Sequence, residues 1–220
     1  MKYKTFIFDF DYTLCDATVG IVACVNYALG QLGLGEKSCD AIKRTVGMTL
    51  SDMFFTLTKV SDERATKQFF AYFMNKADDI MTASTVLIPD SIDTLTRLKQ
   101  KGCNTAIVTT KVRYRVEEIL RKYKITDLID IVIGLEDVTE PKPSPEGLLK
   151  AIDFFGVDKE TVLFTGDSLI DANTANNANV DFAAVLTGTT AKDAFFTLPF
   201  KYIENTLTEI ISSCENSPRS

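Results

Sequence analysis

The chain from Pro89 onward alternates short apolar runs with segments in which apolar residues recur every three or four positions. Short apolar runs are typical of buried strands, and the longer period is typical of helices. The pattern predicts strands at residues 104–110, 128–133, 161–165 and 182–186, with a short edge strand at 200–203. It predicts helices at residues 91–101, 112–123, 145–155, 171–178 and 207–211. Strands that alternate with helices predict an α/β fold built on a doubly wound parallel sheet.

The N-terminal apolar run, residues 6–8, leads directly into Asp9 and Asp11. The run predicts another buried strand, and on a regular strand this spacing puts both carboxylates on one face. Adjacent buried carboxylates repel each other and desolvation favours their neutral forms, so the pair predicts a bound cation. The alternative is that the strand has already ended, and that Asp11 and Asp16 are solvated turn or helix-cap residues.

The stretch from residue 18 to residue 85 shows helical spacing and no strand-like alternation. It is too long for an ordinary crossover between two strands, which usually needs one helix. We therefore expect a helical bundle inserted as a cap at residues 17–85, with a Rossmann-like core at residues 1–16 and 86–220. The alternative is that these helices merely cover the sheet.

Composition narrows the chemistry. The chain has no histidine, which excludes Ser-His-Asp and Cys-His catalysis and any histidine-ligated metal. A net charge of -6 without a basic block argues against a nucleic-acid partner. No apolar run is long enough for a membrane span, and five cysteines without metal-ligand spacing predict reduced thiols in a cytoplasmic protein. The polar end, residues 215–220, is expected to fray.

Polar residues follow four of the predicted strands at the point where each strand ends. In doubly wound sheets, ligands bind at the carboxyl ends of the strands. Singly, each has an ordinary explanation: Thr109 as a strand-end hydroxyl, Lys142 as a solvated loop lysine, Asp167 as part of a helix N-cap turn. Their convergence on one edge instead predicts a functional site. The candidates are Asp9, Asp11, Thr109, Thr110, Lys142, Asp167 and, one helical turn further on, Asp171.

These residue types suit phosphoryl transfer. Carboxylates without histidine favour a hard cation with oxygen ligands, and Mg²⁺ fits that description. A hydroxyl and a lysine beside it would hold a phosphate by hydrogen bonding and charge neutralisation. One aspartate can attack phosphorus to form an aspartyl-phosphate. A second aspartate, two residues on, can protonate the leaving oxygen and then activate water.

The same residues resemble the four motifs of the haloacid dehalogenase superfamily, in order. The motifs are Asp9-Phe10-Asp11-Tyr12-Thr13-Leu14, Thr109 after an apolar strand, Lys142 in a Lys-Pro-x-Pro context, and Gly166-Asp167-Ser168-x-x-Asp171. Within the superfamily the chain resembles the phosphoglycolate phosphatase-like group with a helical cap.

The resemblance implies a role for each motif residue. It implies Asp9 as nucleophile, Asp11 as general acid/base, and Thr109 and Lys142 as ligands of the phosphoryl group. It implies that Mg²⁺ is held by the Asp9 side chain, the Asp11 backbone carbonyl and Asp167, with Asp171 in support.

The chain departs from the family pattern at two positions. Tyr12 and Asn179 stand where the family more often has glycine. At Tyr12 we expect changed packing under the cap, not lost activity. Asparagine at 179 tolerates the left-handed conformation with which many helices end.

The resulting prediction is a Mg²⁺-dependent phosphatase for a small phosphomonoester, with phosphoglycolate as the first substrate to test. The alternatives are a nucleotidase or pyrophosphatase, a sugar-phosphate mutase, and a non-catalytic phosphate-binding module. In the predicted cap, Lys43 and Arg44 either meet a second anionic group of the substrate or lie on a solvated helix face. Gly47 is either a hinge-like substrate loop or a helix terminator. The sequence carries no sign of the oligomeric state.

Overall fold

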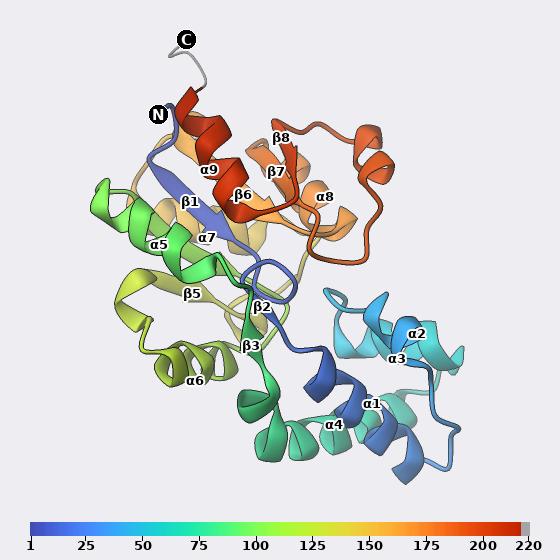
Figure 1. The fold of residues 1–220 in the computed structure, drawn as a ribbon. Coiled ribbons are helices and arrows are strands. Elements are labelled where there is room, and N and C mark those ends of the chain that lie inside the picture. Colours follow the sequence, from blue (N-terminus) through green and yellow to red (C-terminus); the bar gives the residue numbers. More distant parts are fainter. Residues whose placement is uncertain (217–220) are drawn as a thin grey trace. The chain divides into compact units, whose positions relative to one another are not determined.

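The computed structural model describes residues 1–216 and divides into two compact units (Figure 1). One unit contains Met1–Cys15 and the chain from Leu87 onward; the other is Asp16–Val86. Two short strands, β2 (Cys15–Asp16) and β3 (Val86–Leu87), form a separate two-stranded sheet.

The first unit is built on a parallel sheet with the strand order β5-β4-β1-β6-β7-β8. From β1 at the centre, the chain runs outward through β4 and β5, then crosses to β6 on the other side of β1 and continues through β7 and β8. The direction of winding therefore reverses beside β1, and such a point opens a crevice at the carboxyl ends of the strands. The predicted α/β fold is confirmed. The strands are Thr5–Phe8, Asn104–Val108, Ile131–Ile133, Val162–Gly166, Asp181–Val185 and Tyr202–Glu204 for β1, β4, β5, β6, β7 and β8.

Helices cover both faces of this sheet because alternate residues of its strands point to opposite sides. Phe6 and Phe8 of β1 belong to one apolar cluster with α5, α6 and α9, whereas Ile7 belongs to another with α7 and α8. This two-sided burial explains why β1 is an uninterrupted apolar run. The helices are α5 (Ser91–Gln100), α6 (Arg113–Tyr123), α7 (Glu146–Phe155), α8 (Leu169–Ala178) and α9 (Leu207–Asn216). Short 3-10 turns lie at Thr126–Leu128, Leu135–Asp137, Lys159–Thr161 and Lys192–Thr197.

The second unit is a helical bundle with its own apolar core. Its helices are α1 (Thr18–Gln31), α2 (Cys39–Lys43), α3 (Leu50–Thr58) and α4 (Glu63–Ser84). Phe54 of α3 and Phe69 of α4 are fully buried, with ring centroids 4.9 Å apart. Thr49 and Asp62 accept backbone N–H bonds as N-caps of α3 and α4, and so fix where these helices begin. That this unit acts as a cap stays a prediction.

The first strand ends earlier than the sequence suggested. β1 stops at Phe8, so the prediction that Asp9 and Asp11 share one face of a strand is wrong. The alternative, a strand that ends before Asp9, is right about the strand end. It is wrong about Asp11, which is buried, whereas exposed Asp16 does accept the Thr18 N–H near the start of α1. The reason is a turn in which Tyr12 adopts a left-handed φ of 63°.

Further differences lie at the ends of segments. The predicted strand at 128–133 begins only at Ile131, because the chain first makes a 3-10 turn at Thr126–Leu128. Residues 215–220 were expected to fray, but Glu215 and Asn216 belong to α9. The rest of this prediction, residues 217–220, lies outside the described part of the chain. Among the described residues, no helix is long and apolar enough to cross a membrane.

Candidate active site

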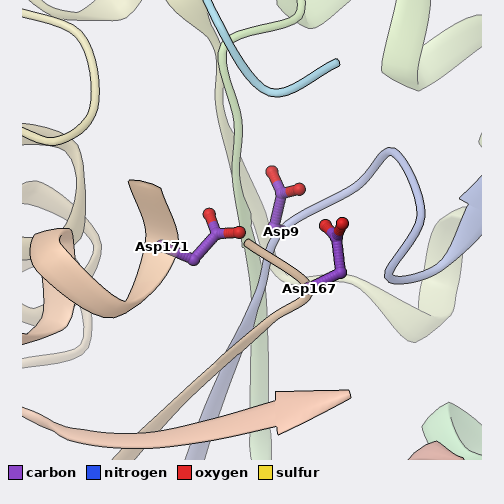
Figure 2. Close-up of side chains that lie close together, drawn as sticks. All are labelled: Asp9, Asp167 and Asp171. Carbon is purple, nitrogen blue, oxygen red and sulfur yellow. The ribbon is translucent and has the colours of Figure 1, made fainter. Parts of the chain in front are cut away.

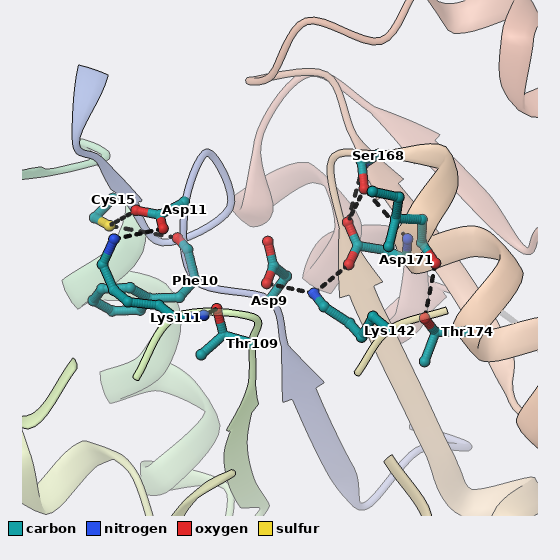
Figure 3. A network of polar contacts seen from close by, with 11 residues as sticks. Asp9, Phe10, Asp11, Cys15, Thr109, Lys111, Lys142, Ser168, Asp171 and Thr174 are labelled. Atoms are coloured by element: carbon teal, nitrogen blue, oxygen red, sulfur yellow. Dashed lines mark hydrogen bonds and ion pairs between the residues drawn. The ribbon is translucent and has the colours of Figure 1, made fainter. Parts of the chain in front are cut away.

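Asp9 is the first residue after β1 and lies at the point where the sheet reverses its winding. Its side chain is buried, and its Oδ1 lies 2.6 Å from the Lys142 ammonium nitrogen (Figure 3). Lys142 comes from the loop before α7 and also contacts Asp171 Oδ1 at 2.6 Å. Glu146, in the first turn of α7, accepts the backbone N–H groups of Thr139 and Glu140 and so orders that loop. The sequence-predicted lysine is therefore a buried cation beside the candidate nucleophile.

Three carboxylates meet at this position (Figure 2). Asp9, Asp167 and Asp171 each offer an oxygen, and these oxygens lie within 4.8 Å of one another. Asp167 follows β6 directly, while Asp171 lies in the first turn of α8. Ser168 is the N-cap of α8, and its hydroxyl lies 2.6 Å from Asp171 Oδ2. The helix cap thus fixes one carboxylate of the cluster.

Two glycines make room for these carboxylates. A Cβ at Gly166 would lie 2.4 Å from Asp171 Cγ, and one at Gly188 would lie 1.8 Å from Asp167 Oδ2. Either distance is shorter than any normal contact. Gly188 was not predicted as a site residue. It follows β7 at the same edge of the sheet, and this strand-end position is the sequence signal that could have identified it.

Burial, the attraction of Lys142 and the repulsion between the carboxylates together set the pKa values of the cluster. Burial raises the pKa of Asp9 to about 7, against the attraction of Lys142. Burial and the neighbouring carboxylates Asp171 and Asp9 raise the pKa of Asp167 well above its usual range. Burial would lower the pKa of Lys142, but the Asp171 and Asp9 carboxylates raise it above its usual value. Three carboxylates around one ammonium favour the binding of a further cation.

The Asp11 side chain has a different lysine partner from Asp9. Its Oδ2 lies 2.7 Å from Lys111 Nζ, and the exposed fractions of the two side chains are 11% and 10%. In Figure 3 this pair lies apart from the Asp9–Lys142 pair, and Cys15 Sγ lies 3.6 Å from Asp11 Oδ1. Burial would lower the pKa of Lys111, but Asp11 raises it. Sequence analysis did not assign Lys111 a role, because a lysine after a strand gives no sign of which carboxylate it meets.

The remaining candidates divide between the two units. Thr109 is buried at the end of β4, where its hydroxyl accepts the Lys111 N–H at 3.2 Å, and Thr110 follows it, half-buried. Lys43, Arg44 and Gly47 belong to the helical unit, where Gly47 has a left-handed φ of 93° between α2 and α3. Their role toward the site stays a prediction.

Comparison with known proteins identifies the family. Residues 6–185 match the family model of the haloacid dehalogenase-like hydrolases. The chain belongs to this family. The predicted family and enzyme class are thereby confirmed: this is a haloacid dehalogenase-like hydrolase.

Individual relatives match this hydrolase over most of their length. "Probable phosphatase IndB" of Dickeya dadantii (strain 3937) is 30% identical, over 94% of this chain and 91% of its own. "Pyrophosphatase PpaX" of Bacillus cereus (strain AH820) is 28% identical, over 84% of each chain. A solved structure of a haloacid dehalogenase-like protein from Bacteroides fragilis is 43% identical, with a TM-score of 0.92 over 94% of this chain and 99% of its own.

Proposed function

We propose that this hydrolase is a Mg²⁺-dependent phosphatase that cleaves a small phosphomonoester through an aspartyl-phosphate on Asp9. The observation that carries the proposal is the surroundings of Asp9. Its carboxylate is buried at the switch point of the sheet, with Lys142 at 2.6 Å and two further carboxylates beside it. The names of two relatives, a probable phosphatase and a pyrophosphatase, support cleavage of a bond between phosphorus and oxygen.

The chemistry needs two half-reactions. In the first, an Asp9 oxygen attacks phosphorus, the bond from phosphorus to the leaving oxygen breaks, and Asp11 gives that oxygen a proton. In the second, Asp11 takes a proton from water, the water oxygen attacks phosphorus, and the Asp9 carboxylate leaves. Lys142 and the Thr109 hydroxyl would hold the phosphoryl oxygens throughout. The second carboxyl at position 11 favours phosphoryl transfer over carbon–halogen cleavage, which does not use it.

The carboxylates fit a magnesium ion. Mg²⁺ prefers oxygen ligands and binds through one or two carboxylates together with water and phosphate. Asp9 and Asp167 would hold it with the Asp11 backbone carbonyl. Asp171 would support them, because Lys142 and Ser168 already occupy its two oxygens. When bound, the ion would neutralise charge on the phosphoryl group.

Substrate choice belongs to the helical unit in this proposal. We assign it the role of a cap, with Lys43, Arg44 and Gly47 as the residues to test. Phosphoglycolate is the first substrate to try, and the relatives named pyrophosphatase make pyrophosphate the second. Five free cysteines favour a cytoplasmic location.

The test is phosphate release from a panel of small phosphomonoesters and pyrophosphate, with Mg²⁺ and after EDTA. Wild type is compared with Asp9→Asn and with Asp153→Asn, a matched change at an exposed aspartate of α7. We expect release that needs Mg²⁺, is abolished in Asp9→Asn and is retained in Asp153→Asn. Full activity after rigorous chelation would contradict the assignment of a metal cofactor. Near-wild-type activity of Asp9→Asn would contradict the assignment of Asp9 as nucleophile.

A further inference from the structure

Lys111, which forms a buried ion pair with Asp11, is not one of the motif residues. Lys111 leaves the end of β4 two residues after Thr109, and its ammonium reaches the turn after β1. About nine-tenths of each side chain is buried. A buried ion pair is weak evidence for a gain in stability, since desolvation of both charges offsets their attraction. Its position beside the nucleophile therefore calls for another explanation.

The two acids of the Asp-x-Asp turn are held by two different lysines (Figure 3). Lys142 holds Asp9 within the carboxylate cluster, while Lys111 holds Asp11 outside it. A fourth carboxylate turned into that cluster would add repulsion to three that are already crowded. Lys111 offers Asp11 a partner elsewhere and so keeps the two acids apart.

The two oxygens of Asp11 also differ. Oδ2 lies 2.7 Å from the Lys111 ammonium, a short charge-assisted contact. Oδ1 faces the Cys15 thiol at 3.6 Å, and a thiol is a weak donor. The ion pair on Oδ2 fixes where the carboxyl group lies, whereas Oδ1 is held only by this weak contact.

We infer that Lys111 is a positioning residue, which anchors Asp11 through Oδ2 so that Oδ1 exchanges the proton with the leaving group and then with water. The inference rests on the proposed phosphatase activity. Lys111 itself forms and breaks no bond in either half-reaction. Without it, Asp11 is expected to lose its fixed place, and misplacement of a catalytic group by about 1 Å can lower a rate by about 10²-fold.

The leaving group separates this role from a purely structural one. The ratio kcat/KM reports on the first half-reaction, in which the leaving oxygen departs. An alkyl phosphate needs a proton on that oxygen, whereas p-nitrophenolate leaves without one. Loss of the general acid therefore lowers kcat/KM for the alkyl phosphate far more than for p-nitrophenyl phosphate, by a share of the roughly 10²–10⁴-fold that acid catalysis contributes.

The experiment measures kcat/KM on both substrates for wild type, Lys111→Met, Lys111→Arg and Asp11→Asn. Lys150→Met is the matched control, because Lys150 pairs with Glu146 at a partly exposed position of the same unit. We expect Lys111→Met to lose at least about 10-fold more on the alkyl phosphate than on p-nitrophenyl phosphate, as Asp11→Asn does. Lys111→Arg should recover part of the difference, and Lys150→Met should show none. Equal losses on both substrates would overturn the inference.

A double variant guards against misfolding of Lys111→Met. Asp11→Asn with Lys111→Met removes both buried charges together, which avoids an unpaired ion. If Lys111 acts through Asp11, kcat/KM of the double variant for the alkyl phosphate should lie within about twofold of that of Asp11→Asn, because Lys111 then has no acid/base group left to position. A further tenfold loss would show that Lys111 acts independently. If wild type releases no phosphate from either substrate, the proposed function itself fails. If wild type is active and Lys111→Met is equally active, only the inference about Lys111 fails.

Discussion

Gly188 gives the sharpest test of the carboxylate cluster, because its backbone lies against Asp167. In Gly188→Ala, the new methyl carbon would lie 1.8 Å from Asp167 Oδ2, 2.6 Å from its Cγ and 2.9 Å from its Cβ. An ordinary carbon–oxygen contact needs about 3.3 Å. The carboxylate oxygen therefore has to move by about 1.5 Å, which is roughly the difference between these two distances.

The expected cost falls on metal binding more than on the fold. Rotation of the Asp167 side chain moves its carboxylate away from the methyl group, whereas its Cβ, at 2.9 Å, is relieved only by a shift of the backbone. Gly→Ala also stabilises the fold by about 0.4–1 kcal/mol because it lowers the entropy of the unfolded chain, and this offsets part of the cost of that shift. In the proposed Mg²⁺ site, however, a displaced Asp167 carboxylate would no longer meet the ion together with Asp9. Changes that disturb the orientation of metal ligands typically lower affinity about 10- to 100-fold. That range corresponds to about 1.4–2.8 kcal/mol.

The assay is calorimetric titration of Mg²⁺ into wild type, Gly188→Ala and the control Gly30→Ala, with circular dichroism as the check of folding. Gly30 lies in α1, and a Cβ there meets nothing within 4 Å. We expect weaker Mg²⁺ binding in Gly188→Ala alone, together with a higher Mg²⁺ requirement for turnover. A folded Gly188→Ala that binds Mg²⁺ within twofold of wild type would refute the assignment of Asp167 as a ligand.

Two further predictions concern stability. Burial would raise the pKa of Asp130, but Lys99 and the Thr105 N–H hold this pKa below its usual value. The carboxylate therefore stabilises the fold above about pH 4, and this stabilisation is lost as the pH falls through the pKa of Asp130 in the folded protein. Asp130→Asn should cost at most about 1 kcal/mol at pH 7 and less at pH 3, as urea midpoints at both values would show; an equal cost at both would contradict the pairing. Asn179 ends α8 at a φ of 56°, so Asn179→Ala should cost about 1 kcal/mol while Asn179→Gly costs nothing, and equal urea midpoints for the two variants would speak against a left-handed cap.

The fold was readable from the sequence because its signals are local. The apolar run of β1 and the alternation after Pro89 both mark buried segments, and each signal can be read within a single segment of the sequence. The exception is the stretch before Ile131, where apolar Leu128 and Ile129 look like strand residues but the chain makes a 3-10 turn. Apolar content alone does not show where pairing with β4 begins.

The site was readable only in part, because its residues are local signals but its contacts are not. The strand-end rule picked out Asp9, Lys142, Asp167 and Asp171, which the structure brings together. It gave no sign that Lys111 would meet Asp11, a contact that spans 100 positions in the sequence. Pairings of this kind follow from tertiary geometry, which periodicity does not encode.

The turn after β1 explains why two lysines serve two acids. Had the strand continued to Asp11, both carboxylates would face the same side and compete for Lys142. The chain instead closes a turn in which the Tyr12 N–H donates to the Cys15 carbonyl at 2.6 Å, with Tyr12 in the left-handed region. That conformation costs a non-glycine residue about 1 kcal/mol, and the hydroxyl of Thr187 donates to the Tyr12 carbonyl and helps to hold it. This turn places Asp11 beside Lys111, so the proposed nucleophile Asp9 and the proposed acid/base Asp11 are kept in separate surroundings.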